Sequence, residues 1–314
     1  MAKCLILGAN GFMGSHLVDA LIKKGETVRA FDRFPNGYEN FQSNENIEIF
    51  LGNFLNVSDL ERALEGVDYV FHLISTTTPA TSDADPRIDI DTNVRMSITL
   101  FELGAEKGIK KVIFYSTGGA IYGDVRTDGL YNELTLPQPV SPYAIGKLTI
   151  EHYLRYFRVK YGLKSVTYRI SNTYGERQSL TSRQGVIPIF LQQISRNEPI
   201  TIFGDGSMVR DYIYVRDVAE MVSATYLNCK EPVYNLGSGQ GYTVNDIVDI
   251  IKQLVPRKVK INHKPAPVTY VHRVILDASL FKNEFNMTPK TNLEEGIKKT
   301  WQYVLKYHDI KGSQ

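Results

Sequence analysis

Short apolar runs alternate with amphipathic stretches along the first 170 residues of the chain. The runs end at glycine or polar turn residues, which is typical of parallel strands buried on both faces. The stretches between them carry apolar residues at helical spacing. The runs predict strands at 3–7, 27–31, 47–50, 69–73, 111–115 and 165–170, and the stretches predict helices at 15–24, 57–64, 91–107 and 143–161. This alternation predicts an α/β fold with a Rossmann-type, doubly wound parallel sheet.

The pattern changes after residue 170, where turn residues become frequent and the strands shorten. Helices are predicted at 185–195, 217–227, 244–254 and 293–306, and short strands at 200–203, 210–215, 233–235 and 259–261. We interpret this part as a smaller α/β lobe that covers the carboxyl edge of the sheet. The predicted division is a first domain over 1–170, to which 213–237 returns, and a lobe over 171–212 and 238–314.

Three glycines, Gly8, Gly11 and Gly14, lie between the first strand and the first helix. Glycines there let the backbone approach a pyrophosphate, and the helix N-terminus offers it N–H groups and the positive end of a dipole. Asp32 ends the second strand, where a carboxylate can accept hydrogen bonds from the adenosine ribose. This unit predicts a bound dinucleotide. Asp32 favours NAD because it repels the 2′-phosphate of NADP, although Arg33 keeps NADP open.

Composition narrows the classes of partner. The chain has 314 residues and a formal net charge of +2, with its basic residues scattered, so it shows no nucleic-acid footprint. The densest basic run, 257–264, alternates with apolar residues and predicts a solvated edge strand. No stretch is long enough to cross a membrane, and the N-terminus predicts a strand rather than a signal peptide. Cys4 and Cys229 indicate neither a disulfide framework nor a metal site. We expect a cytoplasmic protein.

Tyr143 and Lys147 lie four residues apart in a predicted helix that follows Ser141 and Pro142. Residues at this spacing share one face of a helix. A cation beside a tyrosine favours the phenolate and lowers its pKa from about 10, which gives a usable acid and base. The same spacing also occurs by chance in surface pairs. The rest of the chain must therefore supply something for the pair to act on.

Several further motifs occur in a fixed order with these. They are the glycine segment 8–14, Asp32, His72-Leu73, Asn93, Tyr143 with Lys147, Arg169 with Asn172, Arg210-Asp211-Tyr212, and the segment 235–239. With them the chain resembles, over essentially its whole length, the extended short-chain dehydrogenases/reductases of the nucleotide-sugar epimerase/dehydratase group. The resemblance implies a Rossmann-type domain that binds NAD and a C-terminal lobe that binds a nucleoside-diphosphate sugar.

The resemblance also implies roles for individual residues. Asn53 stands where the family usually has aspartate, and its amide oxygen can still accept from the adenine amino group. The implied cofactor contacts are Gly8, Gly11, Phe12, Met13, Gly14, Asp32, Arg33, Asn53, Phe54, Leu73, Ser75, Asn93, Ser116, Tyr143, Lys147 and Ile170. The implied substrate contacts are Thr77, Asn172, Val186, Pro188, Phe203, Arg210 and Arg273. The two arginines suit a diphosphate because a guanidinium fork matches its oxygens.

One position departs from the family pattern. The family usually places Ser or Thr where this chain has Gly118, and that hydroxyl bonds the reacting sugar oxygen beside the tyrosine. Three interpretations follow. Thr117 has taken the role from one residue earlier, a hydroxyl from the loop 75–78 reaches in, or the helper is absent and turnover is slow or lost. We favour Thr117, which completes a predicted catalytic set with Tyr143 and Lys147.

The reaction predicted by these residues is epimerisation. Dehydratases of this group carry an Asp-Glu pair directly after the catalytic threonine, where this chain has glycine and alanine. Epimerisation at C4 of a UDP-hexose needs only Tyr143 and a bound NAD that is regenerated in each cycle. Val274 falls near the position that governs room for a C2 acetamido group, so N-acetylated and uronic sugars stay open. The alternatives are an NAD(P)H-dependent ketosugar reductase, a sugar-nucleotide dehydratase, and a non-catalytic dinucleotide sensor. The resemblance further suggests a homodimer through the helices that begin at Asp91 and Tyr143.

Overall fold

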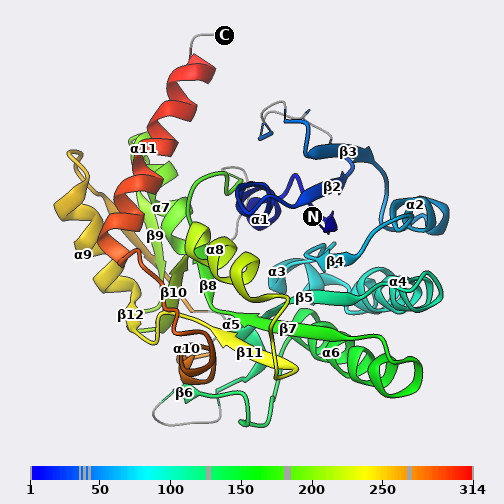
Figure 1. The fold of residues 1–314 in the computed structure, drawn as a ribbon. Helices are drawn as coiled ribbons and strands as arrows, with labels where there is room; N and C mark the ends of the chain where they lie inside the picture. The colour runs from blue at the N-terminus through cyan, green and yellow to red at the C-terminus, as the bar shows by residue number, and fades with distance from the viewer. Residues whose placement is uncertain are drawn as a thin grey trace.

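A computed structural model describes residues 2–34, 37, 40–41, 44–124, 129–179, 185–266 and 271–312. Its largest sheet is entirely parallel and has the strand order β3-β2-β1-β4-β5-β7-β11 (Figure 1). These strands are β1 (Lys3–Leu7), β2 (Thr27–Asp32), β3 (Ile47–Leu51), β4 (Tyr69–His72), β5 (Lys111–Thr117), β7 (Ser165–Ile170) and β11 (Val233–Leu236). The strand order reverses between β1 and β4, which is the point where ligands bind in such sheets. The predicted doubly wound sheet is therefore confirmed.

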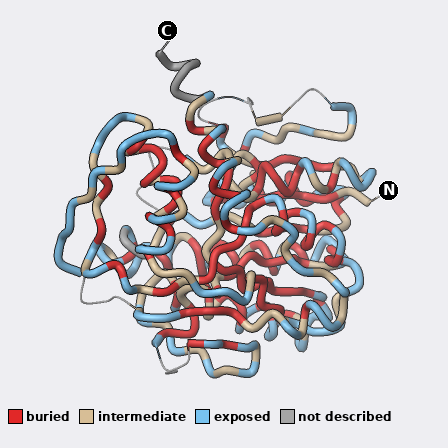
Figure 2. The backbone as a smooth tube through the Cα atoms, turned by 90° about the vertical axis from the view of Figure 1, so that its left-hand side faces the viewer, coloured by how far each residue is buried: buried red, intermediate tan, exposed pale blue. Residues whose placement is uncertain are grey.

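Helices cover both faces of this sheet, as Figure 1 shows. On one face, α1 (Phe12–Lys23) and α8 (Val215–Thr225) pack together over a core that includes Leu17 and Val222. On the other, α2 (Val57–Ala63), α4 (Arg95–Glu106) and α6 (Pro142–Tyr161) enclose a core that includes Leu100 and Phe157. In Figure 2 the buried segments gather in the middle of the molecule, with exposed segments around the rim. The apolar runs and stripes of the sequence thus become two cores.

The structure differs from the predicted elements mainly at their ends. The helix expected from 91 begins instead with a π-helix, η1 (Asp89–Val94), before α4. The first helix starts three residues earlier than predicted, directly after the glycine turn. Short elements were not predicted from the sequence because they are too brief to show periodicity: α3 (Pro79–Ala84), α5 (Gly118–Ile121), β6 (Leu130–Tyr131), β8 (Asn172–Tyr174), β12 (Gly241–Thr243), β14 (Arg273–Leu276) and α10 (Ser279–Phe285).

The C-terminal lobe is built around β10 (Val209–Tyr214), which pairs with β12, β14 and β8. A second, two-stranded sheet joins β9 (Ile200–Phe203) to β13 (Ile261–Lys264), so the strand expected at 259–261 starts two residues later. Helices α7 (Val186–Ser195), α9 (Val244–Leu254) and α11 (Leu293–Gly312) enclose a third core. Because β11 pairs with β7, the chain returns to the large sheet before it completes the lobe.

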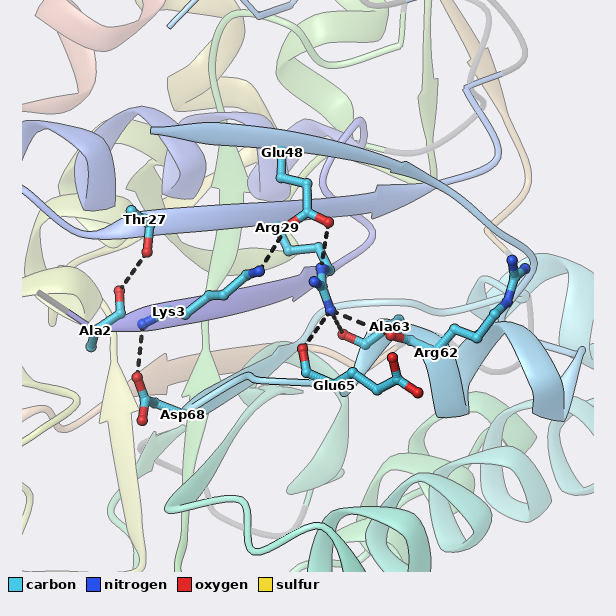
Figure 3. A network of polar contacts seen from close by, with 9 residues as sticks. All are labelled: Ala2, Lys3, Thr27, Arg29, Glu48, Arg62, Ala63, Glu65 and Asp68. Atoms are coloured by element: carbon cyan, nitrogen blue, oxygen red, sulfur yellow. Dashed lines mark hydrogen bonds and ion pairs between the residues drawn. The ribbon is translucent and has the colours of Figure 1, made fainter. Parts of the chain in front are cut away.

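Polar side chains link neighbouring strands near their amino-terminal ends, away from the glycine turn at the carboxyl end of β1 (Figure 3). Arg29 on β2 is buried; its Nε donates to Glu48 at 3.0 Å and its Nη1 to the Ala63 carbonyl at 2.6 Å. The second bond satisfies a carbonyl in the last turn of α2, where cations are favourable. Lys3 completes the group through an ion pair with Glu48 at 2.9 Å.

Over the described residues, no group of three or more His, Cys, Asp or Glu side chains is placed to hold a metal ion. In the same part of the chain, no helix has the length and apolar character needed to cross a membrane. Both Cys4 and Cys229 are free thiols.

Candidate active site

The turn between β1 and α1 requires glycine. Gly8 has φ of +91°, a conformation that side chains rarely adopt. A Cβ on Gly14 would lie 2.0 Å from the Gly8 carbonyl oxygen, so only glycine lets α1 start this close to the turn. Gly11 precedes the helix, and no side chain caps the first N–H groups of α1. These N–H groups remain available to an anion, which fits a pyrophosphate.

Asp32 lies beside this turn. Its Oδ2 accepts a hydrogen bond from the Asn10 N–H at 3.0 Å, which ties the carboxylate to the loop between Gly8 and Gly11. Asn53 follows β3 and is exposed; its Oδ1 accepts from the Leu55 N–H at 3.1 Å and keeps a second lone pair for an adenine amino group. Phe54 differs, because its side chain is buried against the His72 ring. Arg33 is exposed.

A cavity of about 410 Å³ extends from the glycine turn to the start of α6. Its walls come from the carboxyl ends of β1, β4, β5 and β7, where the predicted sheet places its ligands. It brings together eleven of the residues predicted from the sequence: Gly8, Gly11, Phe12, Met13, Gly14, Leu73, Ser116, Thr117, Tyr143, Ile170 and Asn172.

Tyr143 and Lys147 share one face of α6, as their spacing predicts. The Lys147 Nζ lies 5.9 Å from the centroid of the Tyr143 ring and donates a hydrogen bond to the Tyr115 carbonyl at 3.0 Å. Ser141 caps this helix by accepting from the Ala144 N–H at 3.3 Å, and Pro142 occupies its first turn. The cap fixes where α6 begins and therefore where Tyr143 meets the cavity.

The expected effect of Lys147 on the pKa of Tyr143 is wrong in this structure. Burial, followed by the charge of Asp89, raises the pKa of Tyr143 to about 12. Burial lowers the pKa of Lys147 to about 8, against the opposing effects of Asp89 and Glu151. A positive charge added to the cavity would favour the phenolate.

Thr117 lines the cavity, whereas Gly118 is buried and does not. A Cβ on Gly118 would lie 2.3 Å from Leu276 Cδ1, so the position lacks room for a serine or threonine. A Cβ on Gly119 would lie 3.0 Å from the Asn172 Oδ1. A hydroxyl residue at 118 would thus require Leu276 to move, and Thr117 is the neighbouring hydroxyl residue of β5 that lines the cavity.

Several predicted residues take other positions. Ser75 is exposed, and its Oγ donates to the Thr77 carbonyl at 2.9 Å. Thr77 and Asn93 are buried and hydrogen-bonded to Asp89, so they support the loop rather than line the cavity. Ser116 lines the cavity, but its hydroxyl donates to Glu151 at 2.6 Å.

A second cavity, of about 320 Å³, lies in the C-terminal lobe. Asn172, Thr173 and Gly185 line both cavities, so the two adjoin. The second cavity is mostly apolar with one cation, Arg210. It contains five of the predicted substrate contacts: Asn172, Val186, Pro188, Phe203 and Arg210.

The two arginines predicted for a diphosphate are placed differently. The Arg210 Nη2 donates to the Val271 carbonyl at 2.6 Å, which holds its guanidinium at the wall of the second cavity. Arg273 lies exposed on the neighbouring strand β14 and lines neither cavity. Val274 is buried in a separate apolar cluster with Tyr131 and also lines neither, so its size does not limit the room for a substituent there.

Sequence reasoning missed a buried polar chain behind the cavity. Arg169 on β7 forms an ion pair with Glu151 on α6 at 2.7 Å and donates to the Tyr122 hydroxyl at 3.0 Å. The Tyr122 hydroxyl donates to Asn235 Oδ1 at 2.7 Å. Glu151 lies four residues beyond Lys147, so helical spacing could have pointed to it. No sequence signal linked Tyr122 to Asn235, which are 113 positions apart.

Comparison with known proteins agrees with this geometry. A family model described as "NAD dependent epimerase/dehydratase family" matches residues 4–237. The chain belongs to this NAD-dependent epimerase/dehydratase family. Its cofactor is therefore NAD, and the uncapped N-terminus of α1 and the close approach of Gly14 to Gly8 fit a dinucleotide.

Solved members of the epimerase/dehydratase family resemble the whole chain. A UDP-glucose 4-epimerase from Thermotoga maritima, crystallised with UDP-glucose, has a TM-score of 0.90 at 38% identity, covering 98% of this chain and 99% of that one. A UDP-glucose 4-epimerase from Thermus thermophilus in complex with NAD has a TM-score of 0.89 at 32% identity, covering 96% of this chain and 98% of that one.

Members of the family with other activities match as well. A dTDP-4-dehydro-6-deoxyglucose reductase from Escherichia coli is 31% identical over 303 residues, which is 94% of this chain and 95% of the relative. Family membership therefore establishes the cofactor and the fold, and leaves the reaction to the residues of the site.

Proposed function

We propose that this protein is an NAD-dependent epimerase that acts at C4 of a UDP-hexose. The observation that carries the proposal is the junction of the two cavities at Asn172, Thr173 and Gly185. The first cavity holds the glycine turn and Tyr143, and the second offers Arg210 and the apolar side chain of Phe203. A sugar nucleotide that spans the junction places its sugar beside Tyr143 and its nucleotide in the lobe.

The chemistry follows from the side chains of the first cavity. Tyr143 removes the proton of the C4 hydroxyl while C4 loses hydride, and it returns that proton when hydride comes back to the other face of the 4-keto sugar. When bound, NAD would supply hydride transfer, and the positive charge of its nicotinamide ring would favour the Tyr143 phenolate. Lys147 places a positive charge 5.9 Å from the centroid of the Tyr143 ring, and the Thr117 hydroxyl bonds the reacting oxygen.

The composition of the first cavity argues against a dehydration reaction and against a uronic sugar as substrate. Among the described residues that line it there is no aspartate or glutamate, so elimination of water lacks the acid and base that it needs. The same described lining has no lysine or arginine, which leaves the carboxylate of a uronic sugar without an ionic partner. An uncharged hexose is therefore the favoured substrate.

A panel of UDP-sugars tests the proposal. The purified protein is incubated with UDP-glucose, UDP-galactose, their N-acetylated analogues and UDP-glucuronate, first without added cofactor and then with NAD, and the products are separated. We expect C4 epimers to interconvert without net formation of NADH. Oxidation of added NADH with a 4-keto sugar would indicate a reductase, and release of CO₂ from UDP-glucuronate a decarboxylase. No product from any sugar with NAD present would reject the proposal.

We also propose that the protein forms a homodimer through α6 and the adjoining η1–α4 segment. One stripe of α6 exposes Ile145, Tyr153, Tyr156 and Val159, the last with 81% of its surface accessible. An exposed apolar patch of this kind is typical of an interface. Sedimentation is expected to give a dimer for the wild type and a monomer for Val159→Arg. The control Leu134→Arg, at a 94% exposed position off this helix, stays dimeric. A monomeric wild type would contradict the assignment.

Thr117→Ala is expected to lower kcat about ten- to a hundredfold, because a hydrogen bond to a developing charge contributes about 1.5–3 kcal/mol. The measurement is steady-state turnover of the active sugar. In the Thr117→Ala background, Gly118→Ser would not restore activity, because Leu276 occupies the space of that side chain. Wild-type activity in Thr117→Ala would transfer the role to a hydroxyl of the loop 75–78.

A further inference from the structure

Asp89 is a buried carboxylate next to the catalytic helix. It lies in the π-helix η1 and is 3% exposed. Its Oδ2 accepts from the Thr77 hydroxyl at 2.9 Å, and its Oδ1 accepts from the Asn93 Nδ2 at 2.8 Å. Both donors are neutral. A buried charge with only neutral donors is costly unless an opposite charge lies near it.

The carboxylate rests directly on the backbone of α6. A Cβ on Gly146 would lie 3.1 Å from the Asp89 Oδ1, which is tighter than ordinary van der Waals contact. Gly146 stands between Tyr143 and Lys147, three residues after the first and one before the second. The absence of a side chain at 146 therefore lets the carboxylate approach the helix at the level of the catalytic pair.

Two of the buried charges around this point form a direct ion pair, Glu151 with Arg169 at 2.7 Å, with both side chains 7% exposed. Lys147, 5% exposed, and the Asp89 carboxylate, which lies against the neighbouring Gly146, are the other two. The hydrogen bond that the Lys147 Nζ donates goes to the neutral carbonyl of Tyr115.

In the described part of the chain, the other groups that face Lys147 supply no second anion that lacks an ion-pair partner. From β5 it meets the Phe114 ring, 4.8 Å from its Nζ to the ring centroid. From β4 it faces His72. Burial, followed by the charge of Lys147, lowers the pKa of His72 to about 3, so its imidazole is neutral. Glu151 from α6 itself is already paired with Arg169 of β7. The segment 75–82 contributes the hydroxyls of Thr77 and Ser82, and α4 contributes the hydroxyl of Ser97. All three groups are neutral.

We propose that Asp89 is the counter-ion of Lys147 and keeps its buried ammonium charged beside Tyr143. Asp89 is a positioning residue, because it touches neither the cavity nor the reacting atoms. The electrostatics agree with the geometry. The charge of Asp89 raises the pKa of Lys147 against burial and, after burial, raises that of Tyr143. The inference rests on the proposed function for its kinetic consequence only.

The test is Asp89→Asn, which removes the charge and keeps the size. Since Asp89 raises the pKa of both partners, its loss lowers both. We expect both limbs of the kcat–pH profile to move to lower pH by about one pH unit, whichever residue sets each limb. The matched control is Asp91→Asn on the same π-helix, which makes the same charge change at an exposed position and leaves the profile in place.

A second readout does not depend on turnover. The protein as purified, labelled with ¹³Cε-lysine, is titrated by NMR, and the Lys147 resonance is assigned by its loss in Lys147→Arg. In Asp89→Asn its midpoint is expected to fall relative to wild type. Gly146→Ala, which crowds the Asp89 carboxylate, gives a smaller shift in the same direction and serves if Asp89→Asn does not fold.

The outcomes separate the two proposals. Unchanged limbs and an unchanged Lys147 midpoint in Asp89→Asn, with only a lower plateau of activity, would show that Asp89 is structural and overturn this inference. A shifted Lys147 midpoint in a protein that converts no UDP-sugar would support Asp89 as the counter-ion and reject the epimerase proposal instead.

Discussion

Tyr143→Phe is expected to lower kcat for the interconversion of C4 epimers by about 10²–10⁴-fold, the usual contribution of a general acid and base. The substitution removes one oxygen and leaves the ring beside Lys147. NAD binding is expected to persist, because the glycine turn lies at the other end of the cavity and Asp32 is hydrogen-bonded to the loop of that turn. The measurement is steady-state turnover at saturating substrate, together with the NAD content of the purified variant.

The control for this prediction is Tyr153→Phe. Tyr153 lies on the same helix, ten residues further on, but it is exposed on the outer stripe and lines neither cavity. It is expected to keep wild-type kcat. If Tyr143→Phe keeps more than about a tenth of wild-type kcat, the loss is smaller than a general acid and base usually contributes. That result would show that another group transfers the proton.

Arg169→Leu is expected to lower the free energy of unfolding by about 3–5 kcal/mol, because it leaves the buried Glu151 carboxylate without its cation. Burial lowers the pKa of the Arg169 guanidinium, but the hydrogen bond and charge of Glu151 outweigh burial. The pKa is therefore raised overall. The substitution also removes a donor from Tyr122. Denaturant unfolding, with a check that the m-value is unchanged, measures the effect.

Two further variants sharpen this result. Glu151→Leu combined with Arg169→Leu is expected to be less destabilised than the two single changes added together, since no buried charge is then unpaired. Arg62→Ala is the matched control. Arg62 forms an ion pair with Asp59, and its side chain is 62% exposed. Such a pair contributes about 0–1 kcal/mol to the free energy of unfolding. Equal losses in Arg169→Leu and Arg62→Ala would contradict the role of the buried pair.

Much of the site could be predicted from the sequence because its parts are local. The glycine turn, Asp32 and the Tyr143–Lys147 spacing each follow from one strand end or one helix, and the cavity between them contains eleven predicted residues. The structure departs from the expected placement where side-chain direction matters. Thr77 and Asn93 turn into the protein to hold Asp89, and Phe54 turns into the core. Position along the chain does not reveal which way such residues face.

The pKa of Tyr143 shows the same limit. Helical spacing correctly places Lys147 beside the ring. It does not show how deeply the pair is buried or that Asp89, from a different element, lies against the same helix. Burial and that second charge raise the pKa of Tyr143, where the sequence suggested that it would fall.

The sequence by itself determined the parallel sheet, the glycine turn and the placement of Lys147 beside Tyr143, because strand and helix periodicity and short motifs depend on neighbouring residues. Only the tertiary structure decided what packs against Gly118, that Arg210 lines the second cavity while Arg273 lines neither, and that Asp89 lies against the helix of Lys147. Those features depend on contacts between residues far apart in the chain, such as Gly118 with Leu276 and Asp89 with Gly146. Steric exclusion and buried charge arise when such segments meet.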